Sequence, residues 1–166
     1  MKIGIFYGSS TGNTESVANK IKDLLGDADI KSIADINIDE LTTYDLIILG
    51  SSTWGSGELQ DDWFPAAEKL SGLDLKGKKA ALFGTGDQSS YSDTFVDALA
   101  ILHDALQKAG ADIIGAWPAE GYDYSDSQAV KDGMFVGLAI DEDNQSDLTD
   151  ERINKWVSRL KENLPN

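Results

Sequence analysis

The sequence predicts an α/β fold in which helices cover both faces of a doubly wound parallel sheet. Short apolar runs alternate along the chain with segments of helical periodicity, and this alternation is typical of βαβ units. Runs such as 46–49 and 80–83 are apolar at every position, as expected for strands that are covered on both faces. The 166 residues are enough for one domain of ordinary size, spanning 1–166.

Apolar runs indicate five strands. They cover residues 2–7, about 29–33, 44–50 and 78–84, with a last strand in two pieces near 112–116 and 135–140. Between these two pieces, from Trp117 to about Gly133, the chain is polar and rich in turn-forming residues. We therefore expect a surface insertion at about 117–136, too polar for sheet or core helix.

Four segments have the apolar spacing of amphipathic helices, with apolar residues recurring every three or four positions. The first contains Val17 to Leu25, a short one begins near Asp61 and runs to Leu70, a third extends from Phe95 to Ala109, and the last contains Ile153 to Leu164. These helices connect the expected strands in the manner of a parallel sheet.

Composition excludes several classes of function. The chain has 29 acidic and 14 basic side chains, a net charge of -15, one histidine and no cysteine. The absence of cysteine excludes disulfides, thiolate metal sites and iron–sulfur clusters. Strong negative charge disfavours nucleic acid and anionic membranes as partners. The first apolar run, 3–7, is too short for a signal peptide, so we expect a cytoplasmic protein.

Ligands of open α/β sheets bind at the carboxyl ends of the strands. The loop after the first strand, 8–15, is rich in glycine, serine and threonine and leads into a helix, which favours a phosphate site. No lysine or arginine lies between Lys2 and Lys20, so a phosphate would be held by neutral hydrogen bonds. An ordinary Ser/Thr helix cap is the alternative, and both stay open.

Two catalytic motifs fit this loop less well. Residues 8–12 match the G-x-S-x-G nucleophile elbow, but the one histidine, His103, lies inside an expected helix and is better explained as a packing or surface residue. A P-loop is excluded because the glycine spacing and the following lysine are missing.

Aromatic residues stand in the next two loops. Trp54 follows the third strand among small residues, and Tyr91 follows the fourth strand after Asp87 and Gln88. Trp54 could instead fold back on the core. Two rings beside a phosphate loop favour a clamp around a flat, phosphorylated molecule, for which Asp87 and Gln88 offer polar groups.

Several strings identify a family. They are 6–15 (FYGSSTGNTE), 53–60 (TWGSGELQ), 83–88 (FGTGDQ), 121–124 (GYDY) and 135–145 (FVGLAIDEDNQ). In this order and in these loops, the chain resembles a long-chain flavodoxin over nearly its whole length. The resemblance implies a flavodoxin-like five-stranded sheet of order 2-1-3-4-5, with the insertion of the long-chain group.

The resemblance also implies a function. The chain would bind FMN non-covalently and act as a low-potential one-electron carrier between redox proteins, cycling mainly between semiquinone and hydroquinone. Ser9 to Thr14 would hold the phosphate, Trp54 and Tyr91 would sandwich the ring, and Asp87 would meet its pyrimidine edge. The implied cofactor-binding residues are Ser9, Ser10, Thr11, Gly12, Asn13, Thr14, Thr53, Trp54, Gly55, Ser56, Gly57, Thr85, Gly86, Asp87, Gln88 and Tyr91.

Charge and glycine content refine this expectation. Acidic neighbours would oppose negative charge on the reduced flavin and lower the potential of the second step. In the family, the peptide at Gly55-Ser56 turns over on reduction, and a glycine there accepts φ > 0 without a Cβ penalty. We therefore expect an easy flip and a well-stabilised semiquinone.

Two other functions remain as alternatives. One is an FMN-dependent NAD(P)H quinone reductase, against which the short chain and a stacked Tyr91 both argue. The other is a phosphoacceptor receiver domain, which needs acids where residues 6–8 read Phe-Tyr-Gly. As partners of a carrier we expect basic redox proteins such as ferredoxin–NADP reductase, nitrogenase, photosystem I or pyruvate-oxidising enzymes, attracted by the acidic surface of a monomer.

Overall fold

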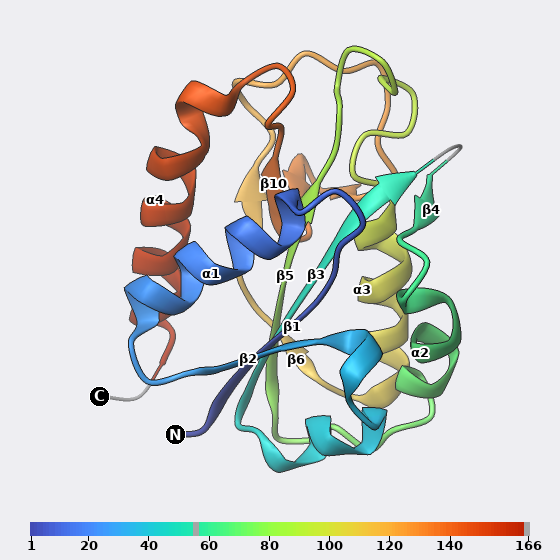
Figure 1. The fold of residues 1–166 in the computed structure, drawn as a ribbon, viewed down its shortest axis with the longest axis vertical. Coiled ribbons are helices and arrows are strands. Elements are labelled where there is room, and N and C mark those ends of the chain that lie inside the picture. The colour runs from blue at the N-terminus through green and yellow to red at the C-terminus, as the bar shows by residue number, and fades with distance from the viewer. Residues whose placement is uncertain (55–56, 165–166) are drawn as a thin grey trace.

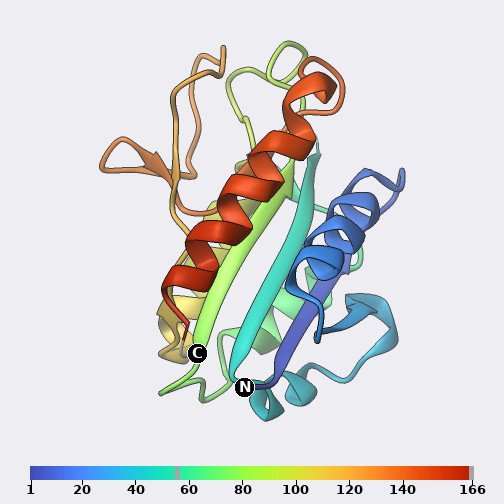
Figure 2. The same ribbon diagram turned by 90° about the vertical axis from the view of Figure 1, so that its left-hand side faces the viewer.

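The fold is a three-layer α/β arrangement, seen in a computed structural model that describes residues 1–54 and 57–164. A parallel sheet forms the middle layer (Figure 1). Helices α1 (Asn13–Leu25) and α4 (Thr149–Glu162) cover one face of the sheet, and α2 (Trp63–Leu70) and α3 (Ala98–Ala109) cover the other (Figure 2). In the described part of the chain, every helix is too short or too polar to cross a lipid bilayer.

The strand order confirms the predicted topology. From one edge to the other, the sheet runs β2 (Asp29–Ser32), β1 (Ile3–Gly8), β3 (Leu46–Trp54), β5 (Lys79–Thr85) and β10 (Leu138–Ile140), all parallel. The predicted interruption of the last strand is also present. The short β6 (Asp112–Ile113) pairs with the start of β5, while β10 pairs with its end.

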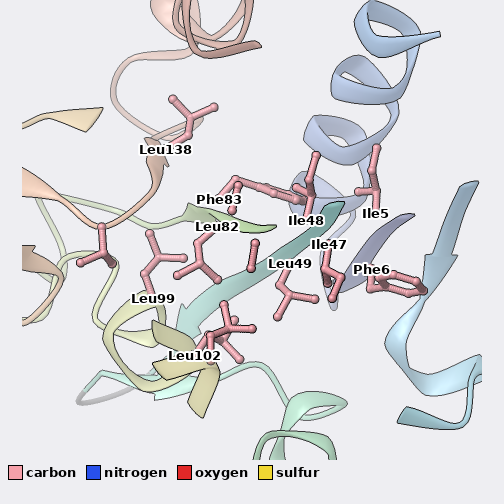
Figure 3. Close-up of a cluster of buried hydrophobic side chains, with 14 of the residues drawn as sticks. Ile5, Phe6, Ile47, Ile48, Leu49, Leu82, Phe83, Leu99, Leu102 and Leu138 are labelled. Atoms are coloured by element: carbon pink, nitrogen blue, oxygen red, sulfur yellow. The ribbon is translucent and has the colours of Figure 1, made fainter. Parts of the chain in front are cut away.

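The core explains why these segments are strands. Side chains 46–49 of β3 are fully buried, as are Leu82 and Phe83 of β5, because helices cover both faces. Figure 3 shows the β3 side chains between those of β1 and β5, with Leu99 and Leu102 of α3 packed from one side. Burial of each side chain of this kind stabilises the folded state by roughly 1.5–3 kcal/mol. The packed sheet is a rigid base for the loops at its carboxyl edge.

Two predicted helices begin later than expected. The short helix starts at Trp63 rather than near Asp61, and α3 starts at Ala98 rather than at Phe95. Val96 has φ 49, which is incompatible with a right-handed helix and rare for a β-branched residue. Phe95 is fully buried against insertion rings. Its apolar side chain therefore packs against the insertion and is not part of a first helical turn.

The insertion contains a sheet, and the prediction that it was too polar for one is wrong. Strands β7 (Trp117–Pro118), β9 (Met134–Phe135) and β8 (Val130–Lys131) pair antiparallel in that order. Asp132 and Gly133 join β8 to β9 with φ 54 and 79, as a type I′ turn requires. A second unpredicted strand, β4 (Glu58–Leu59), pairs antiparallel with the end of β3.

Short 3₁₀ helices complete the chain. They are η1 (Ile33–Asp35), η2 (Ile38–Thr43) and η3 (Ser146–Leu148). The first two connect β2 to β3, and η3 leads directly into α4. The end of β3 and the loops after β1, β5 and β10 lie at one edge of the sheet.

Candidate functional site

A cavity of about 310 Å³ lies at the carboxyl edge of the sheet, within the size range of roughly 300–1,000 Å³ typical of ligand sites. The carboxyl end of β3 and the segments that follow β1, β5 and β10 all contribute to it. The lining residues are Thr11, Asn13, Ser52, Thr53, Trp54, Thr85, Gly86, Asp87, Tyr91, Glu142 and Asp143. The position agrees with the rule that ligands of open α/β sheets bind outside the strand carboxyl ends.

The structure brings together eight of the site residues expected from the sequence. These are Thr11, Asn13, Thr53, Trp54, Thr85, Gly86, Asp87 and Tyr91. Six others stand outside the lining, namely Ser9, Ser10, Gly12, Thr14, Gly57 and Gln88. Gly55 and Ser56, with the expected peptide flip, lie outside the described residues.

The amino terminus of α1 offers backbone N–H groups to the site. Gly12 is the N-cap residue, with φ 93 that favours glycine, and within the described residues no side chain caps the helix. Ser9 Oγ instead accepts a hydrogen bond from the Gly12 N–H at 3.1 Å, one residue before the helix begins. The alternative of an ordinary Ser/Thr cap is therefore wrong. First-turn N–H groups and the helix dipole favour an anion here.

Gln60 connects the first loop to the rest of the site. Its Nε2 donates to Ser10 Oγ at 3.0 Å, its backbone N–H donates to Ser51 Oγ at 3.2 Å, and its Oε1 accepts the Asp62 N–H at 2.9 Å. Since Ser10 Oγ accepts the hydrogen bond from Gln60 Nε2, the Ser10 O–H is free to donate a hydrogen bond to a ligand. Gln60 is the last residue of the motif 53–60, but the sequence did not predict that it would orient Ser10.

A buried hydroxyl pair joins the first turn of α1 to the end of β5. Thr14 Oγ1 and Thr85 Oγ1 lie 2.9 Å apart, and both residues are buried. Thr14 is thus committed to the protein, whereas Thr11 lines the cavity. The hydroxyls of Ser10 and Thr11 remain available to a ligand.

Two aromatic side chains are exposed at the cavity. Trp54 is 39% and Tyr91 45% exposed, although both are large apolar groups. Trp54 Nε1 donates to Ser52 Oγ at 2.7 Å, which holds the indole at the rim. Trp54 is therefore not folded back on the core. Exposed rings at a cavity are surfaces on which a planar ligand can stack.

Asp87 and Gln88 have different environments. Asp87 lines the cavity, and its Oδ1 accepts N–H groups of Ser89 at 3.1 Å and Ser90 at 2.9 Å. The Ser90 N–H is the main cause that lowers the pKa of Asp87 below its usual value. Gln88 is buried, and its N–H and Nε2 donate to Asp141 Oδ2 at 3.0 and 2.7 Å. Gln88 supports the loop and does not reach the cavity.

Three acidic residues, Asp87, Glu142 and Asp143, line the cavity and are here called the acidic wall. Burial, and next the charge of Asp87, raise the pKa of Asp143, with further contributions from Asp141 and Glu142. Among the described lining residues there is no lysine, arginine or histidine to neutralise this charge. Ser52, Glu142 and Asp143 were absent from the predicted site, although the acidic run 141–143 was visible as a signal.

The fold and this cavity define a class of protein. A doubly wound sheet that presents an uncapped helix terminus and two exposed rings at its carboxyl edge is a mononucleotide-binding α/β protein. Comparison with known proteins gives the family. The flavodoxin family model matches residues 5–156.

Individual relatives cover nearly the whole chain. The flavodoxin of Trichodesmium erythraeum is 50% identical over 164 residues, covering 96% of each chain. That of Synechococcus elongatus is 48% identical over 163 residues, with the same coverage. The crystal structure of Fusobacterium nucleatum flavodoxin bound to flavin mononucleotide has a TM-score of 0.94 and 30% identity, covering 99% of each chain. The chain belongs to the flavodoxin family, whose members are electron-transfer proteins rather than enzymes.

Proposed function

We propose that this chain, folded as one domain, binds FMN non-covalently and carries single electrons between partner proteins. One observation carries the proposal: a single cavity joins the uncapped amino terminus of α1 to the exposed rings of Trp54 and Tyr91. This combination suits a ligand with a phosphate at one end and a planar ring at the other. The FMN-bound state of the Fusobacterium nucleatum relative supports the same assignment.

The residues present fit such a group. N–H groups of the first turn of α1 and the hydroxyls of Ser10 and Thr11 would hold the phosphate, with Gln60 orienting Ser10. Trp54 and Tyr91 would flank the ring. Backbone groups of the loop at Asp87 would meet the ring's polar edge, while the Asp87 carboxylate holds that loop in shape. The bound flavin supplies the one-electron chemistry.

The acidic wall would lower the potential at which the bound flavin takes up its second electron. Each carboxylate of this wall would disfavour a unit negative charge on the ligand. At an effective dielectric constant of about 20, such a repulsion amounts to about 4 kcal/mol at about 4 Å and varies inversely with the distance, and about 1.4 kcal/mol corresponds to roughly 59 mV for a one-electron couple. Asp87, Glu142 and Asp143 therefore oppose the second electron. We propose a low-potential carrier that cycles mainly between semiquinone and hydroquinone.

The surface charge suits transient encounters. A net charge of -15 attracts basic proteins over long distances, which speeds association without requiring tight binding. We propose that a cytoplasmic monomer delivers electrons to basic redox partners, of the kind that ferredoxin–NADP reductase, nitrogenase and photosystem I represent.

Flavin titration tests the proposed function. The cofactor-free protein is titrated with FMN and, as a matched control without phosphate, with riboflavin, and quenching of flavin fluorescence is recorded. We expect riboflavin to bind at least tenfold more weakly, because it lacks the group that the α1 terminus would hold; tenfold corresponds to about 1.4 kcal/mol. Equal affinities, or no binding of FMN, would contradict the proposal.

The reconstituted protein then tests the redox assignment. A potentiometric titration is expected to give two well-separated steps, of which the second lies at the lower potential. Coincident steps would contradict cycling between the two reduced states. Rapid oxidation of NADPH with a quinone by the purified protein alone would indicate a reductase instead.

A further inference from the structure

The Gln60 side chain places a buried amide between the loop after β1 and the start of α2. Gln60 is 2% exposed, and its backbone is held by hydrogen bonds from its N–H to Ser51 Oγ at 3.2 Å and from the Trp63 N–H to its carbonyl at 2.9 Å. Its Nε2 donates to Ser10 Oγ at 3.0 Å and to Asp62 Oδ2 at 3.1 Å, and its Oε1 accepts the Asp62 N–H at 2.9 Å. Both amide N–H groups and the amide oxygen are therefore engaged.

Asp62 determines which end of this amide faces Ser10. A reversed amide would place Oε1 beside the Asp62 carboxylate, where two acceptors repel, and Nε2 beside the Asp62 N–H, where two donors meet. Each mismatch would leave a buried polar group without its hydrogen bond, which is costly. Two groups of a single residue thus select the observed orientation.

The orientation of the amide sets the direction of the next hydrogen bond. Because Nε2 donates to Ser10 Oγ, that oxygen is the acceptor, and the Ser10 O–H is left to donate to a ligand. With the amide reversed, the Ser10 O–H would donate to Gln60 Oε1, and the lone pairs of Ser10 would face the ligand instead. An ionised phosphate has acceptor oxygens, so the observed direction attracts it and the reversed direction repels it.

This direction matters because the loop after β1 has few other means of holding an anion. No lysine or arginine lies between Lys2 and Lys20, so a phosphate there depends on neutral donors. Asp62 lines a separate cavity of about 380 Å³, between the η1–η2 segment and α2, and not the cofactor cavity. Acting directly, its carboxylate would only repel a phosphate. A favourable effect of Asp62 must therefore pass through Gln60.

We propose that Asp62 is a positioning residue for the cofactor phosphate: its carboxylate, acting through the Gln60 amide, makes Ser10 a hydrogen-bond donor toward an anion. An acidic residue thereby favours the binding of a negatively charged group. The proposal rests on the proposed function for the identity of the ligand, whereas the orientation of the amide is a property of the cofactor-free protein.

The sign of a change in affinity tests the proposal, because charge repulsion alone predicts the opposite sign. Asp62→Ala removes a negative charge, which by itself would strengthen FMN binding. We expect instead that this substitution in the full-length chain raises the dissociation constant for FMN about fourfold, because the Ser10 O–H loses its fixed direction. A dissociation constant that stayed the same or fell would overturn the proposal.

Asp61→Ala is the matched control. It removes the same charge one residue earlier, from an exposed side chain that takes no part in these hydrogen bonds. The dissociation constant for FMN should stay the same or fall in this variant. Equal weakening by Asp61→Ala and Asp62→Ala would contradict a specific role of Asp62.

Riboflavin and a conservative variant separate positioning from general damage. Riboflavin lacks the phosphate, so its dissociation constant should change less than about twofold in Asp62→Ala; an equal loss for both flavins would refute the proposal. Asp62→Asn keeps an acceptor oxygen for Gln60 Nε2 and should bind FMN within about twofold of the natural chain. If Asp62→Asn were as weak as Asp62→Ala, the Gln60 amide would not be the group through which Asp62 acts.

A double-mutant cycle with Ser10→Ala identifies the end of the hydrogen-bond chain. If Asp62 acts through the Ser10 hydroxyl, Asp62→Ala should change FMN affinity less than about twofold in the Ser10→Ala background, because interacting residues are not additive. An undiminished fourfold loss in that background would show that Asp62 acts elsewhere and would overturn the proposal.

Nuclear Overhauser effects in the cofactor-free protein test the amide orientation without any ligand. Contacts between the Gln60 Nε2 protons and the Ser10 β-protons are expected in the natural chain and in Asp61→Ala, and should weaken in Asp62→Ala. Their absence from the natural chain, or unchanged intensity in Asp62→Ala, would contradict the proposal. If the natural chain failed to bind FMN, the proposed function would fail, whereas this measurement would still decide whether Asp62 fixes the amide.

Discussion

Gly8 occupies a position where the first loop leaves the sheet against two buried side chains. A Cβ at Gly8 would lie 2.2 Å from Gln60 Oε1 and 2.7 Å from Trp63 Cδ1. The Gln60 side chain is held by hydrogen bonds with Ser10 Oγ and the Asp62 N–H, and Trp63 Nε1 donates to the Gly50 carbonyl at 2.8 Å. Neither side chain can withdraw without losing these bonds, so the absence of a Cβ is what allows the first loop to approach them.

Replacing Gly8 is therefore expected to affect both the stability of the protein and the position of the loop after β1. We predict that Gly8→Ala lowers the free energy of unfolding by about 1–3 kcal/mol, the usual effect of overpacking. Gly72→Ala is the control, because its Cβ would meet only the Lys69 carbonyl at 3.5 Å; a change within about 1 kcal/mol is expected there. Urea unfolding measures both, and equal losses would argue against the steric explanation.

Residues of the insertion show what could not be read from the sequence. The strands and the interruption of the last one were predicted from apolar runs, because a buried parallel sheet requires an apolar residue at nearly every position, whereas the strand order was implied by the family resemblance and the ligand edge by the rule for open α/β sheets. The β8–β9 hairpin was missed because its strands have two residues each, although Asp132-Gly133 is a recognisable turn signal. Gln88 was expected to face the ligand. Its orientation depends on Asp141, which is 53 residues away in the chain.

At the scale of elements, the insertion is attached to β10 and α4 by a small polar and aromatic cluster. Tyr122 Oη donates to the Ala139 carbonyl at 2.5 Å and accepts from Trp117 Nε1 at 2.9 Å. The Arg152 guanidinium lies 3.9 Å from the centre of the Tyr122 ring, and its Nη2 donates to the Gly121 carbonyl at 3.1 Å. Ionisation of Tyr122 would remove the proton that it donates to β10.

This attachment makes stability depend on pH in the alkaline range. Burial raises the pKa of Tyr122 from 10.0 to about 12, although the Arg152 charge and the Trp117 hydrogen bond act in the opposite direction; Asp141 and Tyr124 add to the rise. Between these two values the native state holds more protons than the unfolded state, so the free energy of unfolding falls as pH increases. We predict a loss of up to about 2.5 kcal/mol across this window from Tyr122 alone.

Tyr122→Phe tests this prediction. The variant should be less stable by about 1–3 kcal/mol near neutral pH because two buried hydrogen bonds are lost, but its stability should fall less steeply at alkaline pH. Tyr44, whose pKa is also raised to about 12 by burial and by its bond to Asp29, remains in both proteins and cancels in the comparison. Urea unfolding from pH 9 to about 12 measures the difference, and parallel curves would exclude Tyr122 as its cause.

At the scale of the whole molecule, the net charge of -15 acts on both stability and function. In the described part of the chain, five lysines lie within ion-pair distance of a carboxylate, and most of the 29 acidic residues have no such partner. Repulsion among them therefore opposes the compact state. The acidic wall places part of this charge at the cavity, so under the proposed function the charge that would lower the flavin potential would also reduce stability.

Salt should consequently stabilise this protein while slowing its encounter with a basic partner. Raising ionic strength from about 0.01 to 1 M shortens the screening length from about 30 to 3 Å, which weakens repulsion between unpaired carboxylates. We predict that the free energy of unfolding rises by about 1–2 kcal/mol. Urea is the required denaturant because guanidinium would itself screen the charges. Sodium and choline chloride should act alike if screening is the cause. If the free energy of unfolding stayed constant or fell as ionic strength rose, repulsion between the acidic side chains would not be significant in the folded protein. The proposed effects of this charge on the potential and on partner attraction would then be contradicted.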